Sequence, residues 1–165
     1  MIKNKTLTLI HSNIMEFKIC NIWKYRYKKL MFSKKLKIEF IHGTTESILK
    51  IFENEIKDVY GISNEIWNFR ALLMLSHILE ILVWHRDNEQ KYISISKLKF
   101  YLHINNFCSL YQNPNLPENL VFKTKEYTKI FPGYDDTLAK QPEKTNAYFN
   151  YTSMIIIHIL DERFS

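Results

Sequence analysis

The last residues of the chain have the composition of a nucleotide-binding strand. Asp161 and Glu162 follow Met154–Leu160, an apolar run that only His158 interrupts. In a Walker B strand the aspartate holds Mg²⁺ and the glutamate orients water, while the backbone amides and the lysine of a P-loop hold the phosphates. The sequence contains no G-x-x-x-x-G-K-[ST] motif and no Gly-Lys pair. We therefore expect no nucleotide site, no cofactor and no enzymatic activity.

Two histidines and an acid in the middle of the chain have the residue types of a zinc site. His77 and His85 are eight residues apart, with Glu80 between them. A zinc protease places two histidines one helical turn apart, as in H-E-x-x-H, so that both reach one ion. We therefore expect no metal site and a buried, hydrogen-bonded His77. Cys20 and Cys108 match no metal spacing and no disulfide framework, and we expect both to be incidental thiols.

The positive charge of the chain is concentrated in its first quarter. Residues 1–39 carry ten Lys and Arg against two acids, a net charge of +8, whereas residues 40–165 carry thirteen against fifteen, a net charge of −2. Within the first quarter, cations alternate with aromatic residues, and four of the cations are Lys24, Arg26, Lys28 and Lys29. In an extended chain the two sets would lie on opposite faces, so these four are candidate contacts to a polyanion. The same residues also fit an amphipathic surface or a poorly folded basic tail.

The elements that must position these residues are predicted to be helices from about residue 44 onward. Only three glycines and four prolines occur in 165 residues, which favours long helices over strands joined by tight turns. Apolar spacing and capping signals predict helices over about 46–60, Glu65–Trp84, Lys97–Tyr111 and 117–131, and a helix or strand over Lys144–Glu162. We expect a mainly α-helical, bundle-like domain at residues 40–165 and an irregular basic segment at residues 1–39.

The predicted helix Glu65–Trp84 is apolar nearly all round, which is typical of the central helix of a bundle. A polar turn at 86–89 is expected to follow it. Its longest apolar run, Ala71–Trp84, has 14 residues and contains polar ones. A membrane-spanning helix needs about 20 apolar residues. We therefore expect no membrane span in this chain and a cytoplasmic location.

Three stretches resemble, in order, the coupling proteins of Dot/Icm-type secretion systems and of the related IncI-plasmid transfer systems (DotL/IcmO and TrbC, within the TraG/TraD-like family). Phe40–Thr45 is similar to the family's F-x-x-G-S-S start of a helix. Glu65–Ala71 is similar to an acid-x-Trp-x-x-Arg-Ala helix start, and Leu82–Asp87 to its L-V-Y-x-R-D end. Tyr127–Tyr134 is similar to Y-L-x-x-L-P-G-Y, and Lys140-Gln141 follows as in the family. The resemblance covers about residues 40–160.

The resemblance implies the all-α insertion between Walker A and Walker B of a RecA-like ATPase at the cytosolic face of the inner membrane. It implies contact with DNA or secretion-system proteins. The motif positions that it marks as structural are Trp67, Arg70, Ala71, Pro132, Gly133 and Tyr134. The family's P-loop and membrane helices have no counterpart here. Its Q-H-G-(aromatic)-x-x-M-Q run is present only as Tyr148–Ile155, with Gln, His and Gly replaced.

Three functions remain open from the sequence. The first is a fragment of a coupling protein that acts as a substrate- or partner-interaction module. The second is a small basic nucleic-acid-binding helical protein driven by residues 22–37, whose DNA binding would depend on salt and on residues 1–39. The third is a decayed open reading frame without function, which would lack a cooperative unfolding transition.

Overall fold

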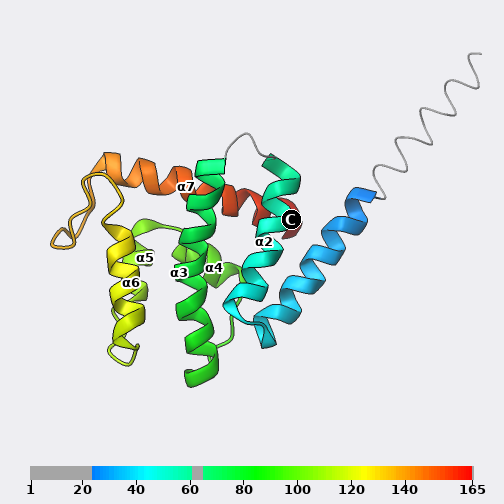
Figure 1. Ribbon diagram of the computed structural model, residues 1–165, viewed down its shortest axis with the longest axis horizontal. Helices are drawn as coiled ribbons and strands as arrows, with labels where there is room; N and C mark the ends of the chain where they lie inside the picture. Colours follow the sequence, from blue (N-terminus) through cyan, green and yellow to red (C-terminus); the bar gives the residue numbers. More distant parts are fainter. Residues whose placement is uncertain (1–23, 61–64, 165) are drawn as a thin grey trace, which may run out of the picture.

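The computed structural model describes residues 24–60 and 65–164, and all regular structure within these ranges is helical (Figure 1). The first described helix covers residues 24–42 and is called the basic helix below. It is followed by α2 (Thr45–Tyr60), α3 (Glu65–Glu89), α4 (Ile95–Tyr101), α5 (Ile104–Leu110), α6 (Glu118–Thr128) and α7 (Glu143–Phe164). The prediction of a mainly α-helical domain is confirmed. The predictions made for Cys20 and for the other residues of 1–23 lie outside the described residues.

Helix α3 is the central element, with α2 and the basic helix on one side, α5 and α6 on the other, and α7 across its N-terminal end (Figure 1). Its inner face follows the 3.6-residue period and buries nine residues: Asn68, Ala71, Met74, Leu75, Ile78, Leu79, Ile81, Leu82 and His85. Among the described helices it alone is long and apolar enough to cross a membrane by length and composition. The core helix of a folded domain passes the same test, and α3 packs against four other helices.

Helix α3 extends five residues beyond the predicted end at Trp84. The helix stops at Gln90, which has a positive φ of 56°. The amide of Lys91 then donates to the carbonyl of His85, six residues earlier, at 3.2 Å, and so gives a hydrogen bond to one of the last carbonyls of the helix. Residues 86–89, predicted to form a turn, are therefore the last turn of the helix.

The basic helix corrects the prediction of an irregular N-terminal segment for residues 24–39. Phe32, Leu36 and Phe40 recur every four residues, and all three are buried. The Phe32 ring packs edge-on against Phe52 of α2 and Phe164 of α7, with ring centroids 5.8 and 5.9 Å apart. Apolar residues on the other faces of this helix obscure the period in the sequence. The division expected between residues 39 and 40 falls inside the helix.

The turn between the basic helix and α2 is held from α3. Arg86 donates through Nη1 to the carbonyl oxygen of Gly43 at 2.7 Å, and more distantly to those of Phe40 and Glu39. The amide of Gly43 also donates to the carbonyl of Glu39 at 2.6 Å. A guanidinium is well suited to hold several carbonyls at the end of a helix. Thr44 caps α2, since its Oγ1 accepts from the amide of Ser47 at 3.2 Å.

The helix predicted over Lys97–Tyr111 is two helices, α4 and α5. Ser94 caps α4, accepting from the amide of Lys97 at 3.1 Å. The break comes at His103, which is extended, with φ −112° and ψ 137°. Leu102 and Ile104 on either side of it are both buried. No glycine or proline marks this position, so tertiary packing rather than local preference ends α4.

Helix α7 resolves the alternative between helix and strand at the C-terminus. It buries residues at helical spacing, among them Phe149, Thr152, Ile156 and Leu160. Near its end, Arg163 donates to the Glu55 carboxylate of α2 through Nε at 2.9 Å and Nη2 at 2.7 Å. Both side chains of this ion pair are largely buried. The pair therefore fixes the end of α7 against α2 while the start of α7 crosses α3.

Candidate functional site

The Trp-Arg-Ala motif joins α3 to α7. The Arg70 guanidinium lies 4.9 Å from the Trp67 ring centroid and 5.1 Å from that of Tyr148, and it also donates to the Tyr148 hydroxyl. The Trp67 ring itself contacts Tyr148 and Tyr151, with centroids 5.2 and 4.5 Å apart. Such cation–π and ring–ring contacts stabilise a joint between helices. Ala71, the third motif residue, is fully buried in the core.

The Pro-Gly-Tyr motif forms the turn that follows α6. Gly133 has a φ of +76°, a left-handed conformation in which other residues are strained. Thr145 of α7 donates through Oγ1 to the carbonyl of Pro132 at 2.7 Å, and the amide of Tyr134 donates to Phe131 at 3.1 Å. The motif therefore turns the chain back toward the start of α7. Both sets of motif residues make contacts within the fold.

A buried glutamine closes the loop after this turn. Gln141 accepts from the Asp135 amide at 3.0 Å and donates to the Asp135 carbonyl at 2.7 Å. The two bonds satisfy both polar atoms of the buried side chain and fold residues 135–141 into a closed loop. This loop forms one wall of a pocket.

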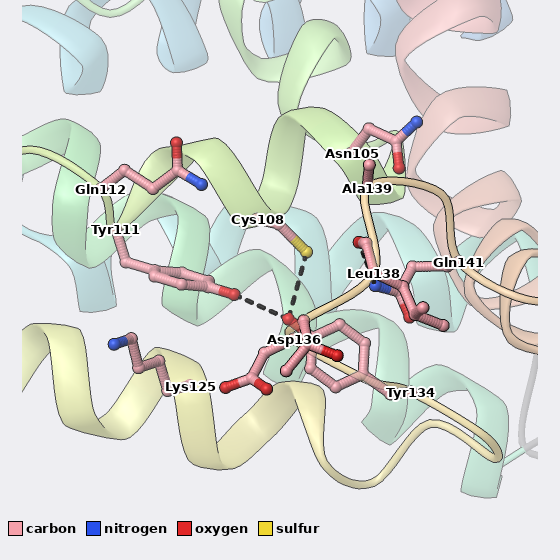
Figure 2. A pocket seen from close by; sticks show the side chains of 11 residues that line it. Asn105, Cys108, Tyr111, Gln112, Lys125, Tyr134, Asp136, Leu138, Ala139 and Gln141 are labelled. Carbon is pink, nitrogen blue, oxygen red and sulfur yellow. Dashed lines mark hydrogen bonds between the residues drawn. The ribbon is translucent and has the colours of Figure 1, made fainter.

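The pocket has a volume of about 670 Å³ and lies between α5 and the loop (Figure 2). The Tyr111 hydroxyl is 2.9 Å from that of Tyr134, and the Cys108 sulfur is 3.5 Å from the same Tyr134 oxygen. Figure 2 shows both groups directed at that oxygen. Burial is the first cause that raises the pKa of Tyr111 and of Tyr134 above the ordinary phenol range. Both phenols therefore stay neutral, which suits hydrogen bonding and not nucleophilic attack.

Sequence reasoning did not find this pocket. Tyr111 ends α5, Tyr134 follows the Pro-Gly turn, and Gln141 precedes α7. Only the folded chain brings these residues together, and no local spacing indicates their proximity.

The acidic pair at the C-terminus does not have the geometry of a Walker B site. Asp161 and Glu162 lie on helix α7 and not at the end of a strand. The Asp161 carboxylate is 2.5 Å from Lys99 Nζ, and Glu162 is 3.3 Å from His158 Nε2. The observed role of these acids is to form ion pairs at the surface.

The histidines of α3 point to different neighbours. His85 contacts the Glu89 carboxylate through Nδ1 at 2.6 Å. His77 lies against the Tyr127 ring, with centroids 4.7 Å apart. Burial, and then the nearby Lys123 charge, lower the pKa of His77 to about 4. Among the described residues, no group of three side chains could hold a metal ion.

The prediction of a buried, hydrogen-bonded His77 is wrong in detail. The residue is half-buried, and its Nδ1 has no hydrogen-bond partner within the described ranges. Glu80, one turn further, has one buried oxygen without a partner, and its other oxygen is 3.7 Å from Lys123 Nζ. Two buried polar atoms at the contact between α3 and α6 therefore lack hydrogen-bond partners among the described residues.

The four candidate polyanion contacts lie on the basic helix. Lys24, Arg26 and Lys28 are exposed and Lys29 is half-buried. The expected separation of aromatics from cations does not occur, because the chain is helical there. The Tyr25 ring centroid lies 5.4 Å from the Arg163 guanidinium carbon, and both Tyr25 and Tyr27 are exposed.

Large apolar side chains are exposed on both helices beside the Trp67–Arg70 joint. Ile66 and Phe69, three residues apart on the first turns of α3, are 68% and 65% exposed. Tyr151 and Met154 of α7 are also exposed. Isolated exposed apolar residues are common in folded proteins, whereas contiguous apolar patches are typical of binding surfaces.

No protein-family model, curated protein or solved structure matches this chain.

Proposed function

We propose that this chain is a helical interaction module, similar to the all-α insertion of type IV coupling proteins, that binds a protein of a secretion or transfer apparatus and has no nucleotide site of its own. The observation that carries the proposal is the pair Ile66 and Phe69, exposed beside the joint between α3 and α7.

The side chains of the motif residues make contacts within the fold and so hold a scaffold together, which supports a binding role for the surface beside them. Arg70 is held by two rings and a hydroxyl, and Gly133 and its neighbours form a turn onto α7. A scaffold built in this way presents fixed surfaces. Ile66 and Phe69 project from the first turns of α3, next to that scaffold, where a partner would meet an ordered apolar surface.

The competing class is a nucleotide-hydrolysing enzyme. Its metal-binding acid would be Asp161, but the Asp161 carboxylate pairs with Lys99 on the outside of a helix. ATP binding in the micromolar range that is lost in Asp161→Ala would contradict the proposal.

Site-specific photo-crosslinking in the cells that encode the chain tests the proposal. A photoreactive residue replaces Ile66 in one variant and Lys140, which is exposed in the loop, in a matched control. We expect a discrete crosslinked protein from position 66 that is absent from position 140 and lost when Phe69→Gln is added. The absence of any product specific to position 66 would contradict the proposal.

A further inference from the structure

The outer face of the basic helix carries an apolar stripe that Lys34 interrupts. Five large side chains are exposed there: Tyr27, Leu30, Met31, Ile38 and Ile41, between 47% and 64% of their area. Their spacing of three, four and seven residues places them along one side of a helix about 28 Å long. Single exposed apolar residues need no explanation, whereas a row along the whole length of a helix does.

Cations border the stripe on both sides. At 100° per residue, Lys24, Lys28 and Lys35 lie along one edge, Arg26 and Lys37 lie along the other, and Lys34 lies within it. All six side chains are exposed. Residues 24–42 contain seven Lys and Arg and one acid, Glu39. The Glu39 carboxylate is turned inward, where it accepts from the Ser47 hydroxyl at 2.5 Å.

The stripe cannot turn inward, because the opposite face of the same helix belongs to the core. Leu36 is fully buried, and Phe32 packs on α2 and α7. Arg86 holds the carbonyl of Gly43, directly after the helix. The outer face is therefore presented in a fixed orientation along one edge of the molecule (Figure 1).

The charge and the apolar character of this surface together indicate the kind of partner that it binds. An anionic bilayer surface offers phosphates to cations and an acyl layer to the apolar residues between them. Lysine and arginine at the edges can extend their aliphatic stems along the apolar layer while their charged groups reach the phosphates. A nucleic acid would satisfy the cations, but it offers no apolar phase to Leu30, Ile38 and Ile41.

We propose that the basic helix binds the protein peripherally to anionic phospholipid membranes, with the stripe buried at the interface and the bordering cations on the lipid phosphates. The helix lies in the plane of the membrane surface and does not span it. This inference is independent of the partner surface at Ile66 and Phe69, which lies on a different helix.

Vesicle co-sedimentation of the full chain tests the proposal. The probes are vesicles of phosphatidylcholine alone and of phosphatidylcholine mixed with phosphatidylglycerol. We expect binding to the mixed vesicles that is at least about tenfold stronger than to phosphatidylcholine alone and that weakens with salt. Equal binding to both, or none to either, would overturn the proposal.

A double substitution that changes no charge distinguishes burial of the stripe in the membrane from attraction of the cations to the lipid phosphates. Leu30→Gln with Ile41→Gln leaves every cation in place, and we expect it to weaken binding to mixed vesicles at least about tenfold. Ile66→Gln with Phe69→Gln is the matched control and should bind as the wild type does. Circular dichroism verifies that each variant is folded. Unchanged binding by the Leu30/Ile41 variant would show attraction by charge alone and would overturn the proposal.

Two further outcomes would assign the stripe to another occupant. Fluorescence anisotropy with a single-stranded oligonucleotide reports nucleic-acid binding. The membrane proposal would be overturned if the protein bound the oligonucleotide more tightly than the mixed vesicles. In that case oligonucleotide binding would be reduced in the variant in which Lys24, Arg26, Lys28 and Lys29 are replaced by Gln, and unchanged in the Leu30/Ile41 variant. Sedimentation velocity reports dimers. If dimers form in the wild type but not in the Leu30/Ile41 variant, and the protein does not bind vesicles, the stripe binds a second copy of the chain and the membrane proposal is overturned.

Discussion

Arg70 illustrates how one side chain can join two helices that are distant in the sequence. Its guanidinium contacts the rings of Trp67 and Tyr148, and the Tyr127 hydroxyl donates to its backbone carbonyl at 3.4 Å. The sequence marks Arg70 and Trp67 through a motif, so their importance could be predicted. Their partner Tyr148 could not, because its position beside Arg70 depends on the crossing of α3 and α7.

The environment of His77 makes the stability of the fold depend on pH. Its folded-state pKa is lowered from 6.5 to about 4, because the ring is buried against Tyr127 and lies near Lys123. As pH falls below 6.5, the unfolded chain takes up a proton that the folded chain does not bind until about pH 4. The contribution of neutral His77 is therefore complete above pH 6.5 and is lost progressively down to about pH 4.

The wild-type protein is expected to lose unfolding free energy as the pH falls from 6.5 to 4, and in His77→Phe this loss should be smaller by about 1–2 kcal/mol. This magnitude allows for the half-buried position of the ring. Urea denaturation at a series of pH values measures this difference. The matched control is His42→Phe, because His42 is exposed, and it should retain the wild-type acid dependence. An unchanged pH profile in His77→Phe would contradict the assigned environment.

At the scale of elements, helices with one apolar face and local capping signals could be predicted. The start of α3 at Glu65 agrees with the sequence analysis. The basic helix was missed because its buried face and its exposed stripe are both apolar, so no single period dominates. The break at His103 was missed because buried neighbours, and not a glycine or proline, end α4.

The basic helix offers a matched pair of leucines that tests whether it belongs to the fold. Leu36 is fully buried and Leu30 is 64% exposed. We expect Leu36→Ala to lower the free energy of unfolding by about 2–5 kcal/mol and Leu30→Ala to change it by less than about 0.5 kcal/mol. Chemical denaturation followed by circular dichroism measures both. Equal, small effects would mean that the inner face does not contribute to stability.

At the scale of the molecule, one core connects the first described helix to the last. Phe32 of the basic helix contacts Phe52 of α2 and Phe164 of α7, and α7 in turn crosses α3. A helix tied to the core in this way holds its outer face in a fixed orientation. The central claim is therefore structural: residues 24–42 are part of a single cooperative helical module, and their inner face fixes the surface that they present.

Native-state hydrogen exchange of the full chain tests this claim most directly. We expect the amides of Phe32, Leu36 and Phe40 to be protected to the same degree as those of Leu75 and Ile78 in α3, because both sets are buried and open only in global unfolding. The protection of both sets should then decrease together in low denaturant. Rapid exchange across residues 32–40 while α3 stays protected would contradict the claim, since the basic helix would then open independently of the core.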